Sequence, residues 1–188
     1  MKDAITFLAE LGVAVVLVRL AGLRWKDAGW STLGKIIPTA GLVLTGAWFL
    51  ESLARELLAD KPMMVMVLIV PVLEETLRWF LVRVLELETC ALGTLAGSVM
   101  GVFETVFVIA RGGTGQPTLL FRTLGTLPLH CFAGGLVARG VTFLPLNTAC
   151  HIAFNGGIFL AGAEGFFIAL LSIGLLCGFW LAMTMTHR

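Results

Sequence analysis

The segment of about residues 63–85 is apolar, yet it carries Glu74, Glu75 and Arg78 near its middle. A charged side chain at the centre of a membrane helix costs roughly 2.5 to 3.5 kcal/mol on insertion scales, so these side chains need partners or a function. At helical pitch Arg78 lies one turn from both carboxylates. It can pair with one of them while the other points about 100° away, toward a neighbouring helix. A purely structural ion pair that locks a helix bundle is one interpretation of this pattern.

Composition indicates what surrounds that segment. Of the 188 residues, 58% are hydrophobic and only 13% are charged, whereas about a quarter of the residues are charged in soluble domains. Such a chain has too little polar surface to cover a soluble core, so lipid is expected to be its outer solvent. The net charge is +1 and the sequence has no Lys/Arg run, which argues against a nucleic-acid partner.

Seven segments are long and apolar enough to cross a bilayer, because a span needs ~20 residues. They cover about residues 4–23, 36–58, 63–85, 89–110, 118–139, 143–161 and 164–184. We therefore predict an all-α fold, a polytopic integral membrane bundle of about seven transmembrane helices. With no repeat or soluble segment evident, residues 1–188 are expected to form a single membrane-embedded domain.

Small residues in these spans are expected to serve packing. Gly93, Gly97 and Gly101 recur at four-residue intervals, a spacing that lets another helix approach closely. The four cysteines form no C-x-x-C pair and three lie in apolar segments, where cysteine usually packs as a small hydrophobe, so we expect no disulfide. The Gly-rich loop at 111–117 lacks a Walker lysine and a preceding strand, and is expected to be a turn.

Polar residues of different spans fall at matching depths. Consecutive spans run in opposite directions, so depth can be counted from one membrane face at ~1.5 Å per residue. From the face where the third span begins, one layer lies about ten to thirteen residues deep and contains Glu74, Glu75, His130 and His151. A shallower layer, at about five to seven residues, contains Glu104, Arg122 and Asn155. A shared depth favours a reaction centre or an ion site over independent structural pairs.

These residue types can support hydrolysis. A carboxylate beside histidines can activate water, and an asparagine amide or an imidazole N–H can stabilise an oxyanion. His151 and Asn155 are four residues apart, so both can face one cavity. Glu104 and Arg122 are expected to form an ion pair that supports the site.

A metal is the other way to activate that water. His130, His151 and Glu75 would make an open zinc ligand set, which would leave the second carboxylate as general base. No H-E-x-x-H motif is present. Metal-bound and metal-free water are therefore both open on the sequence.

Four motifs, in this order along the chain, resemble those of the PrsW-type intramembrane proteases. They are Glu74-Glu75-x-x-Arg78, Phe103-Glu104, Arg122-x5-Pro128-x-His130-x3-Gly134 and His151-x3-Asn155. The wider clan includes the CAAX prenyl proteases and bacteriocin-processing membrane proteins. The likeness covers about residues 71–155, within a motif-bearing core of about 62–161. Arg78 stands where a lysine is usual in the family, and Thr105 stands where an asparagine often follows the glutamate.

The resemblance implies a multi-pass protease of a bacterial or archaeal cell membrane. Its expected substrate is a membrane-anchored protein or peptide, in which it hydrolyses a peptide bond. Glu74 and Glu75 would activate or position the attacking water, and Asn155 would stabilise the oxyanion. His130 and His151 would bind Zn²⁺, with Glu75, or act as acid, base and oxyanion donors without a metal. The supporting residues would be Arg78, Glu104 and Arg122.

Two other functions fit the same residues. A catalytically silent membrane scaffold of the same clan would keep the polar core for packing alone. A small proton-coupled or cation-coupled transporter would use Glu74, Glu104 and the histidines as a relay.

Overall fold

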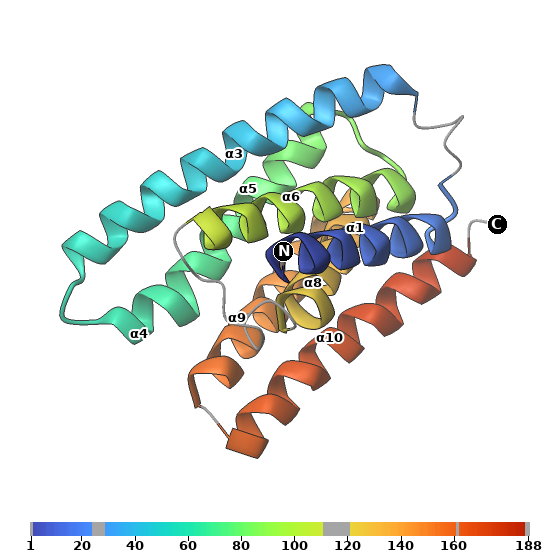
Figure 1. The fold of residues 1–188 in the computed structure, drawn as a ribbon. Coiled ribbons are helices and arrows are strands. Elements are labelled where there is room, and N and C mark those ends of the chain that lie inside the picture. The colour runs from blue at the N-terminus through green and yellow to red at the C-terminus, as the bar shows by residue number, and fades with distance from the viewer. Residues whose placement is uncertain (1, 24–28, 111–120, 161, 187–188) are drawn as a thin grey trace.

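The structure, a computed structural model, describes residues 2–23, 29–110, 121–160 and 162–186. Every regular element in these ranges is a helix (Figure 1). The elements are α1 (Lys2–Leu20), α3 (Trp30–Leu57), α4 (Pro62–Met64), the π-helical turn η1 (Val65–Ile69), α5 (Val70–Val84), α6 (Cys90–Ala110), the π-helical turn η2 (Arg122–Thr126), α8 (Leu127–Arg139), the 3₁₀ turn η3 (Val141–Phe143), α9 (Leu144–Leu160) and α10 (Gly162–Met185). The predicted all-α fold is confirmed.

Each of the seven predicted spans is helical over most of the residues that the structure describes, and the first ends at Leu20 rather than near residue 23. The second span was predicted too short at its start. Its helix, α3, begins at Trp30 rather than near residue 36, so Pro38 lies inside the helix and not in its first turn. The Gly-rich loop at 111–117 lies outside the described residues.

Among the residues that the structure describes, four helical segments are long and apolar enough to cross a membrane: α3, α6, the η3–α9 segment and α10. The outer surface of the bundle is apolar as well. On α10, for example, Phe166, Phe167 and Leu171 are exposed. Long apolar helices with an apolar outside are what a bilayer requires, and they identify a membrane protein.

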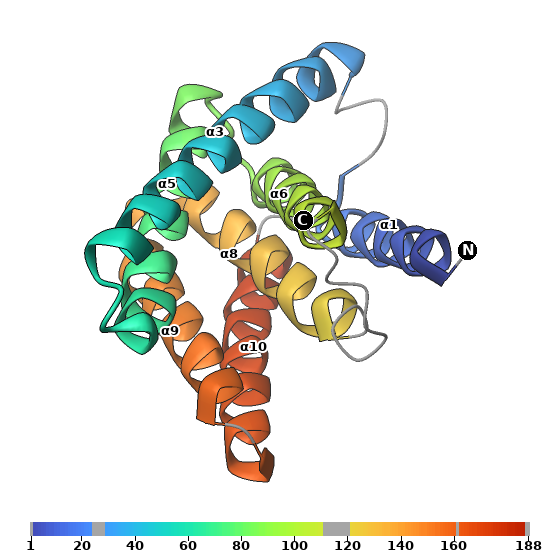
Figure 2. The same ribbon diagram turned by 60° about the vertical axis from the view of Figure 1, so that its left-hand side comes forward.

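Helix α8 lies in the middle of the bundle and contacts α1, α5, α6, α9 and α10 (Figure 2). Its side chains Leu129, Cys131 and Leu136 are fully buried. Trp180 of α10 is buried against it, and the indole N–H donates to Thr94 Oγ1 at 2.8 Å. The last helix is almost wholly apolar in sequence, and this hydrogen bond from Trp180 joins it to α6. All four cysteines are free, as predicted.

The glycines of α6 give the close helix contact that their spacing predicts. A Cβ on Gly97 would lie 2.1 Å from the backbone oxygen of His130, and one on Gly93 would lie 2.3 Å from that of Gly134. Only glycine fits at such contacts, because the neighbouring atoms belong to the backbone and cannot rotate away. The backbone around His130 is therefore held directly against α6.

Gly97→Ala is expected to destabilise the protein by about 1–3 kcal/mol, since α6 and α8 must separate to admit the methyl group. Gly46→Ala in α3 is the matched control, because a Cβ there meets nothing within 4 Å. Unfolding curves in detergent measure both variants. Equal stability of the two would contradict the packing described for α6 and α8.

Candidate functional site

A π-helical turn followed by a proline precedes both the Glu74-Glu75 pair and His130. In each case, the π-helical turn ends two residues before the proline, with η1 preceding Pro71 and η2 preceding Pro128. A proline has no N–H to complete the helical pattern, and π turns often occur at functional sites. The polar side chains Glu74 and His130 follow within one turn of these prolines. The prolines are the sequence signal from which these turns could have been predicted.

The η1 turn leaves one backbone carbonyl for Asn155. The N–H of Val70 bonds to the oxygen of Val65, and Pro71 has no N–H to offer the next carbonyl, that of Met66. Asn155 Nδ2 donates to that Met66 oxygen at 3.0 Å. This contact uses one of the two amide N–H groups. The second N–H and the amide oxygen remain for the cavity that Asn155 lines.

Arg78 occupies the centre of the polar core and is fully buried. Its guanidinium donates to Glu75 Oε1 and to His130 Nδ1. Because arginine has no acceptor, Nδ1 of His130 must accept, and the ring proton lies on Nε2. That Nε2–H donates to Glu104 Oε2 at 2.6 Å. The tautomer and the orientation of His130 are thus set by its two neighbours.

The paired carboxylates point in different directions, as the first motif predicts. Glu75 Oε1, which is held by Arg78, also accepts from His151 Nδ1 at 2.9 Å. A carboxylate in that position can only accept, so Nδ1 of His151 carries a proton. The other ring nitrogen, Nε2, lies 3.5 Å from Glu74 Oε2. Glu74 therefore faces α9 and the cavity, while Glu75 is buried and bonded to Arg78.

Glu104 and Arg122 form the predicted ion pair, with Nη2 of Arg122 3.0 Å from Glu104 Oε1. The second oxygen of Glu104 takes the His130 bond. Glu104 thereby joins the two predicted layers. The histidine rings of the deeper layer also meet, with the His130 and His151 centroids 5.8 Å apart and edge to face.

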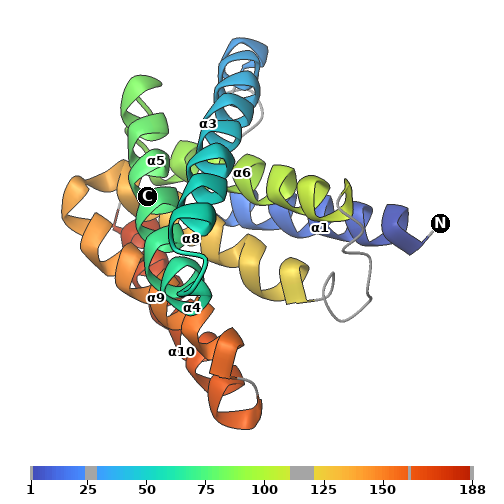
Figure 3. The ribbon, with the colours of Figure 1, turned by 90° about the vertical axis from the view of Figure 1, so that its left-hand side faces the viewer.

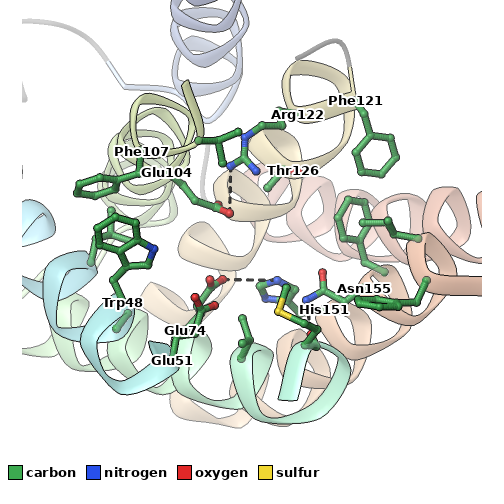
Figure 4. A pocket seen from close by; sticks show the side chains of 18 of the residues that line it. Trp48, Glu51, Glu74, Glu104, Phe107, Phe121, Arg122, Thr126, His151 and Asn155 are labelled. Atoms are coloured by element: carbon green, nitrogen blue, oxygen red, sulfur yellow. Dashed lines mark hydrogen bonds and ion pairs between the residues drawn. The ribbon is translucent and has the colours of Figure 1, made fainter. Parts of the chain in front are cut away.

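A cavity of about 310 Å³ lies where α3, α6 and α9 end and where η1 and η2 begin. Five predicted site residues line it: Glu74, Glu104, Arg122, His151 and Asn155 (Figure 4). The other three, Glu75, Arg78 and His130, are buried and bonded to one another or to lining residues. The structure thus brings all eight predicted residues to one place.

Two stacked aromatic pairs form walls of this cavity. Trp48 and Phe107 have ring centroids 4.9 Å apart, and Phe121 and Phe154 have centroids 5.3 Å apart. Arg55, with a side chain 48% exposed, lines the edge. These walls could not be predicted from the sequence, because aromatic residues are common throughout apolar spans and carry no distinguishing pattern.

The predicted zinc ligands do not form a ligand set here. Within the described ranges, no group of three or more His, Cys, Asp or Glu side chains is placed to hold a metal ion. Both ring nitrogens of His130 are already bonded, to Arg78 and Glu104. The guanidinium of Arg78 also bridges Glu75 and His130, so a cationic side chain takes the place at which the sequence suggested a metal.

No protein-family model matches this chain, and comparisons with curated proteins and with solved structures give no match either. The fold and the site together define a helical membrane protein with a buried, charged centre beside a cavity.

Proposed function

We propose that this protein is an intramembrane endopeptidase that hydrolyses a peptide bond of a membrane-anchored protein or peptide. One observation carries the proposal: Glu74, His151 and Asn155 line one cavity among apolar helices, and hydrogen bonds to Glu75 and to the Met66 carbonyl hold His151 and Asn155 in place. The motifs that resemble PrsW-type proteases point to the same chemistry. The aromatic walls suit the apolar side chains of a substrate that lies in a membrane.

Glu74 is the proposed general base. Its carboxylate takes a proton from a water molecule as the water oxygen attacks the scissile carbonyl carbon. The free N–H of Asn155 donates to the oxyanion that forms. The carbon–nitrogen bond then breaks, and the proton passes from Glu74 to the leaving nitrogen, directly or through Nε2 of His151, which lies 3.5 Å from Glu74.

Buried residues beside the cavity hold His151 in position next to Glu74. Glu75 holds the Nδ1–H of His151, which orients the ring so that Nε2 faces Glu74. The carboxylate of a catalytic triad orients its histidine by the same logic. Since the donor set around His130 does not fit a metal, no step of the proposal passes through one.

The test is peptide cleavage by purified protein in liposomes, with a library of membrane-spanning peptides and mass spectrometry of the products. The metal content of the same samples is measured beside that of His130→Ala and His151→Ala. We expect cleavage by the wild type without stoichiometric metal, and loss of cleavage in His151→Ala. Stoichiometric zinc that disappears with activity in either variant would contradict the metal-free route. Absence of cleavage would favour the scaffold, and proton or cation flux would favour the transporter.

A further inference from the structure

Glu10 lies outside the motif-bearing core, in the middle of α1. Figure 3 shows α1 alongside α6, and the two helices are in contact. Glu10 is fully buried there. A carboxylate among apolar helices needs a partner or a function, and nothing in the proposed mechanism uses this one.

The contacts of Glu10 lead to the candidate site. Thr105 Oγ1 donates to Glu10 Oε1 at 2.8 Å, and Arg122 Nε donates to Thr105 Oγ1 at 2.9 Å. A threonine hydroxyl has one proton. Because that proton goes to Glu10, the oxygen lone pairs of Thr105 are turned toward Arg122.

Arg122 bonds to Thr105 through Nε, and its Nη2 contacts the candidate site. Nη2 of Arg122 lies 3.0 Å from Glu104 Oε1, and Glu104 Oε2 accepts the Nε2–H of His130. Three hydrogen bonds with a fixed donor and acceptor, and the ion pair between Arg122 and Glu104, therefore connect Glu10 to His130. Within the described part of the chain, the second carboxylate oxygen of Glu10 is buried without a hydrogen-bond partner, so the bond from Thr105 is the contact through which Glu10 can act.

We propose that Glu10 is a positioning residue for the candidate site, which acts through Thr105 to hold Arg122 on Glu104 and so fixes the hydrogen bond of His130. Arginine is long and flexible, and Arg122 and Glu74 line the same cavity. An Arg122 released from Thr105 could turn toward Glu74 and neutralise it. The inference rests on the proposed function only for its consequence on catalysis, because the hydrogen bonds stand without it.

Nitrogen-15 NMR of the histidines tests the proposal without a substrate. The chain has only three histidines, so His151→Asn and His187→Asn assign the signals of His130. In the wild type we expect His130 to carry its proton on Nε2. In Glu10→Ala and Thr105→Val the Nε2 resonance of His130 is expected to shift. Glu10→Gln, which keeps an acceptor oxygen for Thr105, is expected to stay close to the wild type.

Thr148→Val is the matched control, since the hydroxyl of Thr148 bonds to a carbonyl of its own helix, that of Leu144. An unchanged His130 signal in Glu10→Ala would overturn the proposal. Equal shifts in Glu10→Gln and Glu10→Ala would also overturn it, because the charge and not the hydrogen bond would then matter. Where peptide cleavage is observed, Glu10→Ala should lower kcat about tenfold with KM unchanged, the effect of losing one net hydrogen bond. Absent cleavage with shifted signals would refute the protease and leave Glu10 as a positioning residue.

Discussion

Glu74→Gln is expected to lower the rate of peptide hydrolysis by about 10²–10⁴-fold, the usual contribution of a general base. Glutamine has nearly the same size but cannot take a proton from water. The fold is expected to persist, because Glu74 faces the cavity and the ion pair that it makes with His151 is long at 3.5 Å. The measurements are kcat/KM on a cleavable membrane peptide and the melting temperature of the same preparation.

Glu56→Gln is the matched control, because it makes the same chemical change on an exposed residue that does not line the cavity, and it should leave the rate nearly unchanged. Glu75→Gln is expected to lower stability as well as rate, since Arg78 and His151 both bond to that carboxylate. A stable, inactive Glu75→Gln beside an active Glu74→Gln would assign the base to Glu75 instead.

Arg78→Leu is expected to destabilise the protein by about 3–5 kcal/mol, the cost of removing one partner from a buried ion pair. Glu75 would lose its counter-charge, and Nδ1 of His130 would lose its donor. Unfolding in detergent measures the effect. Arg55→Leu is the control, because its side chain is 48% exposed and exposed ion pairs contribute little.

Arg78→Lys should fall between these variants. An ammonium on a flexible stem carries the same charge, but it lacks the planar fork with which arginine bonds two partners at once. If Arg78→Leu were no less stable than Arg55→Leu, the conclusion that Arg78 stabilises the buried polar core through Glu75 and His130 would be wrong.

Depth counting predicted which residues meet, because the rise of a helix per residue is nearly constant. Glu75 and His151 were assigned one depth and are bonded at 2.9 Å. Glu104 and Arg122 were assigned another and are paired at 3.0 Å. The separation of the two layers was not preserved, since Glu104 bonds to His130 at 2.6 Å. A count of backbone positions does not include the reach of a long side chain.

The features of the site that could not be predicted from the sequence have identifiable physical causes. Depth alone does not show that Arg78 extends from one turn away to fill the space between Glu75 and His130, two of the side chains expected as zinc ligands. The π turns change the direction of the side chains that follow them, and a regular helical count does not include such turns. The role of Glu10 could not be predicted from the sequence, because no motif links α1 to the rest of the site.

The most direct measurement is cleavage of a membrane peptide by the wild type in water enriched in oxygen-18. The new carboxyl terminus of the product is analysed by mass spectrometry. If a water held at Glu74 attacks the peptide bond, that carboxyl group carries one oxygen-18 atom. Unlabelled products, or no cleavage of any membrane peptide by folded protein, would contradict the proposal that this cavity hydrolyses peptide bonds.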